Sequence, residues 1–80
     1  MTEQQIQKKR INQLEADGYY VIKLIKTNKN GIPDIIAIPP NTPVLFSEVK
    51  TPKGKTSKIQ EYRLKELKKY GFKTEIYNGI

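Results

Sequence analysis

Cysteine and histidine are both absent from this chain of 80 residues. Without cysteine the chain has no disulfide framework and no thiolate metal site. Without histidine it lacks the commonest general base, the commonest zinc ligand and every Ser-His or Cys-His nucleophilic pair. Any metal ion would therefore be held by oxygen atoms.

Long apolar runs are missing as well. No stretch approaches the length that spans a bilayer, and the polar residues 1–5 do not form a signal peptide. We therefore expect a soluble, cytoplasmic protein with no membrane partner. Its length allows one domain, residues 1–80, with a core only just large enough to hold it together.

The charges are unequal in sign. Fifteen Lys and Arg residues stand against eight Asp and Glu residues, which gives a net charge of +7. Such a field attracts polyanions and speeds their association. Nucleic acid is favoured over an anionic membrane, because no helix combines a broad apolar face with a basic one. Charge alone does not separate a nuclease from a passive binder.

Two helices are indicated by capping boxes, Thr2 with Gln5 and Ser57 with Gln60. The first helix runs to about residue 17 and buries Ile6, Ile11 and Leu14, which share one side at about 100° per residue. The second runs to about residue 70. Its expected buried face contains Ile59, Leu64, Leu67, Tyr70 and also Gln60, and its outward face is basic.

Strand-forming residues fill the segments between and after these helices. Strands are expected over residues 19–25, 34–38, 44–50 and 72–77, with a proline-rich hairpin connection at 39–43. The helical crossover requires the last strand to lie parallel to an earlier one. The sequence therefore predicts an α/β (α+β) fold in the order α-β-β-β-α-β, with a mixed four-stranded sheet flanked by two helices.

The charged residues Asp34, Glu48 and Lys50 lie within or at the start of these strands. Alternation along a strand points Glu48 and Lys50 the same way, and a short loop folds Asp34 back beside them. Two ionised carboxylates need a cation between them, and Mg²⁺ suits oxygen ligands. A neighbouring lysine can hold or deprotonate a water, which indicates hydrolysis. The alternative is a solvated charged face that matches a short motif by chance.

Two further polar residues lie on buried helix faces. Glu3 falls inside the apolar stripe of the first helix, where an acid is unusual without a partner; alternatively it complements the helix dipole. Gln60 lies on the buried face of the second helix, beside the basic loop 51–56, and its alternative role is the capping box itself. Both are candidate site residues.

Four blocks in this order resemble the PD-(D/E)xK nuclease superfamily, and within it the small VRR-NUC domains. The resemblance covers nearly the whole chain and is far more specific than a lone ExK. An acid near the start of the first helix, here Glu3, belongs to the same pattern. The blocks are Gly31-Ile32-Pro33-Asp34, Phe46-Ser47-Glu48-Val49-Lys50, Ser57-Lys58-Ile59-Gln60 and Tyr70-Gly71-Phe72-Lys73-Thr74.

The resemblance implies a restriction-endonuclease-like core and assigns site roles. Asp34 and Glu48 look like the metal-binding acids, with the Val49 carbonyl as a further ligand, and Lys50 looks like the catalytic lysine. Glu3 and Gln60 match additional site positions of the family, and Glu3 looks like a further metal ligand. One departure is that many members carry an arginine before the Gly-x-Pro-Asp block, where this chain has Lys29 and Asn30; lysine lacks the bidentate grip on phosphate.

The implied function is Mg²⁺- or Mn²⁺-dependent hydrolysis of DNA by an endonuclease. Similar stand-alone domains occur in phages and resemble homodimeric nucleases that cut branched DNA such as Holliday junctions. Flanking phosphates would contact lysines, and exposed aromatics would contribute to a dimer interface. Two rival functions are a non-catalytic nucleic-acid-binding module and an anion-binding partner module of a larger assembly. The lysines are Lys29, Lys53, Lys55 and Lys58, and the aromatics are Tyr19, Tyr20 and Tyr62.

Overall fold

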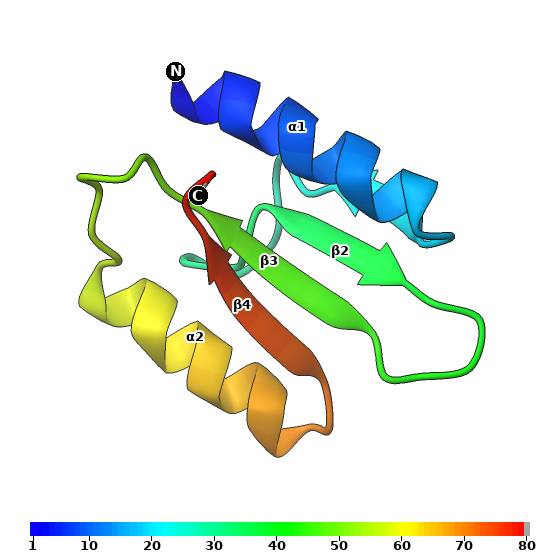
Figure 1. Cartoon of the computed structure of the whole chain (residues 1–80). Helices are drawn as coiled ribbons and strands as arrows, with labels where there is room; N and C mark the ends of the chain where they lie inside the picture. Colours follow the sequence, from blue (N-terminus) through cyan, green and yellow to red (C-terminus); the bar gives the residue numbers. More distant parts are fainter. Residues whose placement is uncertain (80) are drawn as a thin grey trace.

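Two helices flank a four-stranded sheet in the computed structural model, which describes residues 1–79 (Figure 1). The strand order is β1-β2-β3-β4, antiparallel among the first three strands and parallel between β3 and β4. The crossover through α2 permits that parallel pairing. The predicted mixed sheet and element order are confirmed. The bounds are α1 Glu3–Ala16, β1 Tyr20–Lys23, β2 Ile35–Ile38, β3 Leu45–Val49, α2 Lys58–Lys69 and β4 Lys73–Tyr77.

Local signals set the ends of both helices. The side chains of Thr2 and Ser57 each accept a hydrogen bond from the backbone N–H three residues on, and the glutamine there completes the capping box. Gly18 and Gly71 follow the C-caps with φ of 90°, a conformation that glycine adopts without steric cost. Among residues 1–79, neither helix is long and apolar enough to cross a bilayer.

Strand β1 is shorter than the predicted segment 19–25. Its four residues pair with the four residues of β2, and beyond Lys23 no ladder partner continues. Instead the Leu24 N–H donates to the Asp34 carbonyl at 2.7 Å. This bond closes the β1–β2 connection into a loop whose two ends are adjacent.

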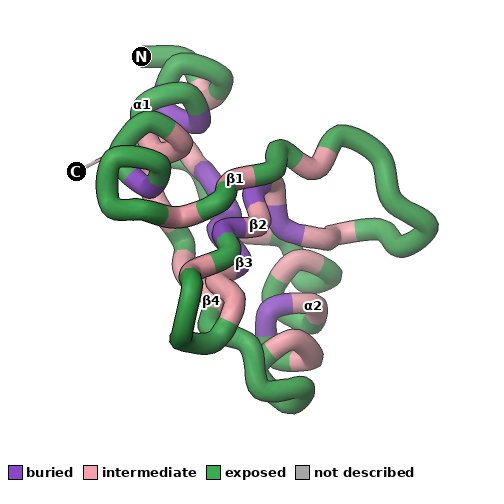
Figure 2. Tube along the Cα trace, turned by 90° about the vertical axis from the view of Figure 1, so that its right-hand side faces the viewer, coloured by how far each residue is buried: buried purple, intermediate pink, exposed green. Residues whose placement is uncertain are grey.

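The main core lies between α1 and the sheet, and α1 and α2 lie on opposite sides of that sheet (Figure 2). Ile6 and Leu14 of α1 pack on Ile35, Ala37 and Val49. These side chains are nearly or fully inaccessible to solvent. The predicted stripe of α1 is therefore confirmed, with Ile11 only partly buried at its margin.

Helix α2 buries a narrower stripe than its sequence predicts. Among the strands it packs chiefly against the edge strand β4. Leu64 is buried as expected. Ile59 and Tyr70 are exposed, and the prediction that they belong to the core is wrong. Tyr70 is the C-cap residue, at the very end of the helix.

Part of the sheet on the α2 side stays open to solvent. The cross-strand pairs Tyr20–Ile38 and Ile22–Ile36 place four large side chains on the same face of β1 and β2. Three of them are exposed, and Tyr20 keeps 70% of its surface in contact with solvent. We refer to Tyr20, Ile22, Ile36 and Ile38 as the uncovered sheet face.

Candidate functional site

The β2–β3 hairpin brings Asp34 and Glu48 together at one end of the sheet. Asp34 immediately precedes β2, and Glu48 is the penultimate residue of the antiparallel strand β3. The Asp34 Oδ2 accepts a hydrogen bond of 2.8 Å from the Val49 N–H, which ties the carboxylate across the two strands. The Lys50 Nζ lies 3.5 Å from the Glu48 Oε2, as expected from alternation along β3.

Glu48 is a buried acid with one oxygen left without a partner. The residue is 1% exposed. Its Oε2 accepts a hydrogen bond of 3.2 Å from the Gln60 Nε2 and also faces Lys50. Its Oε1 is buried and accepts no hydrogen bond from any residue within 1–79. The pKa of Glu48 is raised to about 7, chiefly by burial and also by the neighbouring Asp34 carboxylate, while the Lys50 ammonium partly offsets both effects.

This donor set fits a hard divalent cation. Asp34 and Glu48 offer carboxylate oxygens, and a cation beside the Glu48 Oε1 would satisfy that atom and relieve the repulsion between the two acids. Within residues 1–79 no third acid, and no histidine or cysteine, joins the pair. Water would therefore complete the coordination, as is usual for Mg²⁺.

Of the two additional candidates, Gln60 reaches the acids. Its Oε1 accepts a hydrogen bond of 2.9 Å from the Ser57 N–H in the capping box, while its Nε2 donates to Glu48. Gln60 therefore completes the capping box and also contacts Glu48, and its role as a site residue stays a prediction. Glu3 lies in the first turn of α1, the helix on the opposite side of the sheet, and it does not join the cluster of acids.

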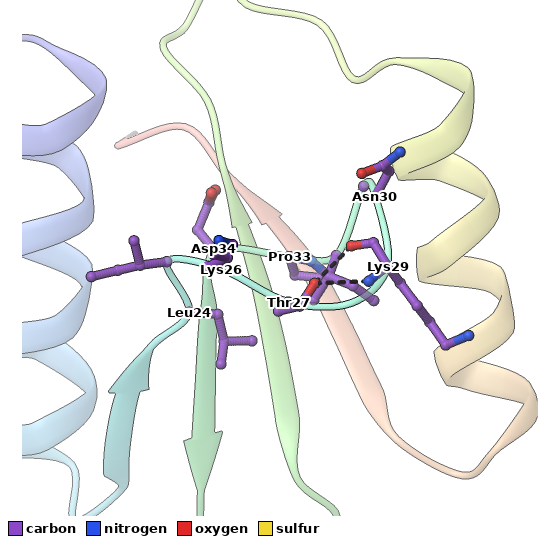
Figure 3. A pocket seen from close by; sticks show the side chains of 10 residues that line it. Leu24, Lys26, Thr27, Lys29, Asn30, Pro33 and Asp34 are labelled. Atoms are coloured by element: carbon purple, nitrogen blue, oxygen red, sulfur yellow. Dashed lines mark hydrogen bonds between the residues drawn. The ribbon is translucent and has the colours of Figure 1, made fainter.

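The loop before Asp34 encloses a polar cavity of about 420 Å³ (Figure 3). Asp34 lies at its border, whereas the Lys29 side chain extends away from Asp34. The Thr27 hydroxyl donates to the Lys29 carbonyl at 2.7 Å and accepts from the Lys29 N–H at 3.3 Å. Hydrogen bonds within the loop therefore hold its shape, and the Lys29 side chain does not reach the acid pair.

Helix α2 holds this loop at two points. The Arg63 Nε donates to the Asn30 carbonyl at 2.9 Å. Gly31 has a φ of 77°, and a Cβ there would lie 2.9 Å from the Ile59 Cγ1 and 3.0 Å from its backbone. Only glycine fits this contact, which explains why the Gly-x-Pro-Asp block begins with it. The contact sets the loop against the turn of α2 that carries Gln60.

A second polar network, which the sequence reasoning missed, lies on the other face of the sheet. The Arg10 Nε and Nη2 each donate to Glu75 at 2.8 Å, and the Ser47 hydroxyl donates to the same carboxylate. The hydrogen bond to Glu75 raises the pKa of Arg10, whose guanidinium also lies 4.8 Å from the centre of the Tyr77 ring. The network joins α1, β3 and β4 directly behind Glu48.

The helical periodicity of α1 already places polar residues on its buried side. At about 100° per residue, Arg10 and Gln7 fall on the same side of α1 as Ile6 and Leu14. Polar residues inside an apolar stripe require partners at the interface. Gln7 is buried, and its Oε1 has no hydrogen-bond partner within residues 1–79.

The remaining candidates are surface residues. Lys53, Lys55 and Lys58 are exposed on the chain segment that leads from Lys50 into α2, and none forms an ion pair within residues 1–79. Tyr19 packs against the core beneath α1, so its assignment as an exposed aromatic is wrong. The other two, Tyr20 and Tyr62, are exposed.

The fold is a mixed four-stranded sheet with two acids and a lysine at the open end of its central hairpin. The chain belongs to the VRR-NUC domain family, whose model matches residues 1–80. A solved VRR_NUC domain has a TM-score of 0.83, with 28% identity over 95% of this chain and 83% of that chain. A second solved structure, a VRR_NUC domain protein, has a TM-score of 0.80 over 100% of this chain and 80% of its own, and at 20% identity it supports the fold alone.

No curated protein matches the chain. VRR-NUC domains are nuclease domains that act on DNA and generally use divalent metals. The donor set at Asp34 and Glu48 agrees with that family property.

Proposed function

We propose that the protein is a Mg²⁺- or Mn²⁺-dependent DNA endonuclease that hydrolyses phosphodiester bonds at the Asp34–Glu48 pair. The observation that carries the proposal is the buried Glu48 carboxylate, which lies near a second acid and a lysine and whose Oε1 has no hydrogen-bond partner within residues 1–79. Asp34, Glu48 and the Val49 carbonyl would hold the ion.

A bound divalent ion supplies Lewis-acid polarisation of the scissile phosphate and lowers the pKa of a bound water. The residues of the chain supply the rest. Lys50 orients the attacking water and offsets the charge that develops on the phosphorus oxygens. Gln60 donates a hydrogen bond to the Glu48 Oε2, which keeps the Glu48 Oε1 in a fixed direction.

Lysines around the pair would bind the flanking phosphates. Lys53, Lys55 and Lys58 follow the site along the chain, and their free charges are available to DNA. Lys29 extends from the loop before Asp34 and would contact a more distant phosphate. Because these contacts go to the backbone, they position DNA without reading its sequence.

We further propose that the active species is a symmetric homodimer acting on branched DNA such as a Holliday junction. The uncovered sheet face supports this, because it exposes Tyr20, Ile22 and Ile38 on the edge strand β1 and its neighbour. A two-fold axis would repeat the Asp34–Glu48 pair and match two strands cut at related positions.

Cleavage assays test the catalytic proposal. Four-way, nicked and single-stranded DNA are incubated with Mg²⁺, Mn²⁺ or EDTA. We expect metal-dependent cuts in the wild type and loss of cleavage in Glu48→Gln and Asp34→Asn, with DNA binding unchanged or tighter because a negative charge is removed. Glu15→Gln, an exposed acid on α1, is the matched control. Parallel loss of binding and cleavage in a folded Glu48→Gln protein would contradict the ligand assignment, and binding without any wild-type cleavage would favour the non-catalytic module.

A further inference from the structure

The outer surface of α2 carries a shallow cavity between two exposed tyrosines. It has a volume of about 290 Å³, and its lining is Tyr62, Lys65, Glu66, Lys69 and Tyr70. Tyr62 is 55% exposed and Tyr70 is 72% exposed. Neither ring contributes to the core, so folding does not account for their presence on this surface.

The floor of the cavity is positively charged. Glu66, its one acid, already pairs with Arg63 at 3.0 Å. The adjacent Glu61 accepts a hydrogen bond from the Thr56 hydroxyl. Lys65 and Lys69 form no ion pair with any residue within 1–79. Two cations without partners therefore lie between two aromatic rings, a combination that suits an anionic ligand with flat, stackable groups.

These residues extend a line that begins at the candidate site. Lys58, Tyr62, Lys65 and Lys69 follow one another at intervals of four, three and four, which keeps them on one side of the helix. Lys58 lies in the same turn as Gln60, the residue bonded to Glu48. The line thus leads from the acids along α2 to the cavity.

We propose that this cavity binds an unpaired strand of nucleic acid, with bases stacked on Tyr62 and Tyr70 and phosphates bound by Lys65 and Lys69. Tyr70 follows Tyr62 by eight positions, which corresponds to about 12 Å along the helix axis and is long enough for more than one nucleotide. In a duplex the bases are stacked on each other and unavailable to the rings, so the cavity selects single strands. That the bound nucleic acid leads towards Glu48 rests on the proposed function, whereas the binding of single strands by the cavity does not.

Arg63 couples the cavity to the site. Its guanidinium lies 5.3 Å from the centre of the Tyr62 ring, and its Nε binds the Asn30 carbonyl in the loop before Asp34. Arg63 therefore contacts both the ring of Tyr62 and the loop before Asp34. A strand stacked on Tyr62 would approach the acids in a fixed position relative to that loop.

Binding without metal tests the proposal separately from catalysis. A labelled 12-nucleotide oligothymidine and a duplex of equal length are titrated with protein in EDTA, and fluorescence anisotropy is measured. We expect Tyr62→Ala with Tyr70→Ala to weaken single-strand binding at least tenfold and duplex binding less than twofold, since stacking contributes about 1–3 kcal/mol per base. Tyr62→Phe with Tyr70→Phe keeps the rings and should retain wild-type affinity.

Matched controls come from the same chain. Ile76→Ala removes an exposed apolar side chain from β4, outside both the cavity and the uncovered sheet face, and Lys8→Ala removes an exposed lysine from α1, as a control for Lys65→Ala with Lys69→Ala. Equal losses in the control and cavity variants would overturn the proposal. So would parallel losses for duplex and single strand, or a change in sedimentation coefficient in the tyrosine variants, which would identify the cavity as a protein contact.

Discussion

At the scale of single residues, the two oxygens of Glu48 have different surroundings. Gln60 and Lys50 both approach Oε2, and Oε1 is buried without a partner within residues 1–79. A carboxylate in this position costs free energy when it is ionised and no cation is bound. The stability of the metal-free protein should therefore depend on the protonation of this one group.

The sign of that dependence follows from the raised pKa. Glu48 has an ordinary pKa of 4.5 when unfolded and one of about 7 when folded, so the folded state binds the additional proton between these values. Its stabilising contribution is complete below pH 4.5 and is lost as pH rises through 7. In EDTA we expect the unfolding free energy to fall by on the order of 2 kcal/mol from pH 5 to pH 8, relative to Glu48→Gln. Denaturant titrations at both pH values measure this. Parallel pH profiles for the two proteins would exclude Glu48 as the titrating group.

Lys50 acts on charge that develops during the reaction, so its removal should affect the rate more than binding. We expect Lys50→Ala to lower single-turnover cleavage by about 10²–10⁴-fold with little change in the Mn²⁺ concentration for half-maximal activity. Lys53→Ala is the control, because an exposed phosphate-binding lysine should weaken DNA binding and leave the maximal rate unchanged. Cleavage near the wild-type rate in Lys50→Ala would return this residue to the role of a partner for Glu48.

At the scale of elements, the contact between Gly31 and Ile59 sets the loop before Asp34 against α2. The contact joins the two segments that supply Asp34 and Gln60. A change there should therefore affect both stability and cleavage.

We expect Gly31→Ala to lower the free energy of unfolding by about 1–3 kcal/mol, since a side chain at positive φ is strained and Ile59 occupies the space. Gly18→Ala is the matched control, with a φ of +90° and nothing within 4 Å of the added Cβ. The melting temperature and the cleavage rate are measured for both. Equal effects of the two substitutions would show that the contact with Ile59 has no role in positioning the site.

Sequence patterns predicted the features that depend on neighbouring residues. Both capping boxes, the glycines after the helices and the shared direction of Glu48 and Lys50 follow from spacings of two to four residues, and the structure has them all. The order of elements and the crossover rule then fixed the parallel β3–β4 pair.

Features that depend on how elements pack were beyond these patterns. The exposure of Ile59 and Tyr70 follows from the position of α2 over an edge strand, which periodicity does not reveal. The separation of Glu3 from the acid pair depends on which side of the sheet α1 occupies. The bond from Arg63 to Asn30 joins residues 33 positions apart, and no local signal marks it.

At the scale of the whole molecule, the uncovered sheet face and the net charge of +7 favour association, with a second copy and with DNA respectively. The apolar face lies on β1 and β2, and the free lysines lie after β3 and on α2. The two surfaces therefore consist of different residues.

We expect Ile22→Glu to shift the dimer towards monomer by at least tenfold in dissociation constant, because it places a charge in an apolar interface. Ile76→Glu is the control, since Ile76 is exposed on β4, at the other edge of the sheet. Sedimentation at micromolar concentration, alone and with a four-way junction, measures the effect. A wild-type monomer under both conditions that cuts junction DNA at full rate would remove the dimer from the mechanism.

The connection between β2 and β3 offers a place to attach a probe. Residues 39–44 join the ends of the two strands that lie farthest from Asp34 and Glu48, with the four residues of β2, about 13 Å, in between. Prolines 39, 40 and 43 restrict this turn, and residues 40–43 are exposed. Exposed loop tips of this kind accept insertions readily. Asn41→Cys would introduce the single thiol of this chain. A fluorophore attached to it would allow individual molecules to be followed on DNA, while the end of the sheet that carries Asp34 and Glu48 stays unaltered.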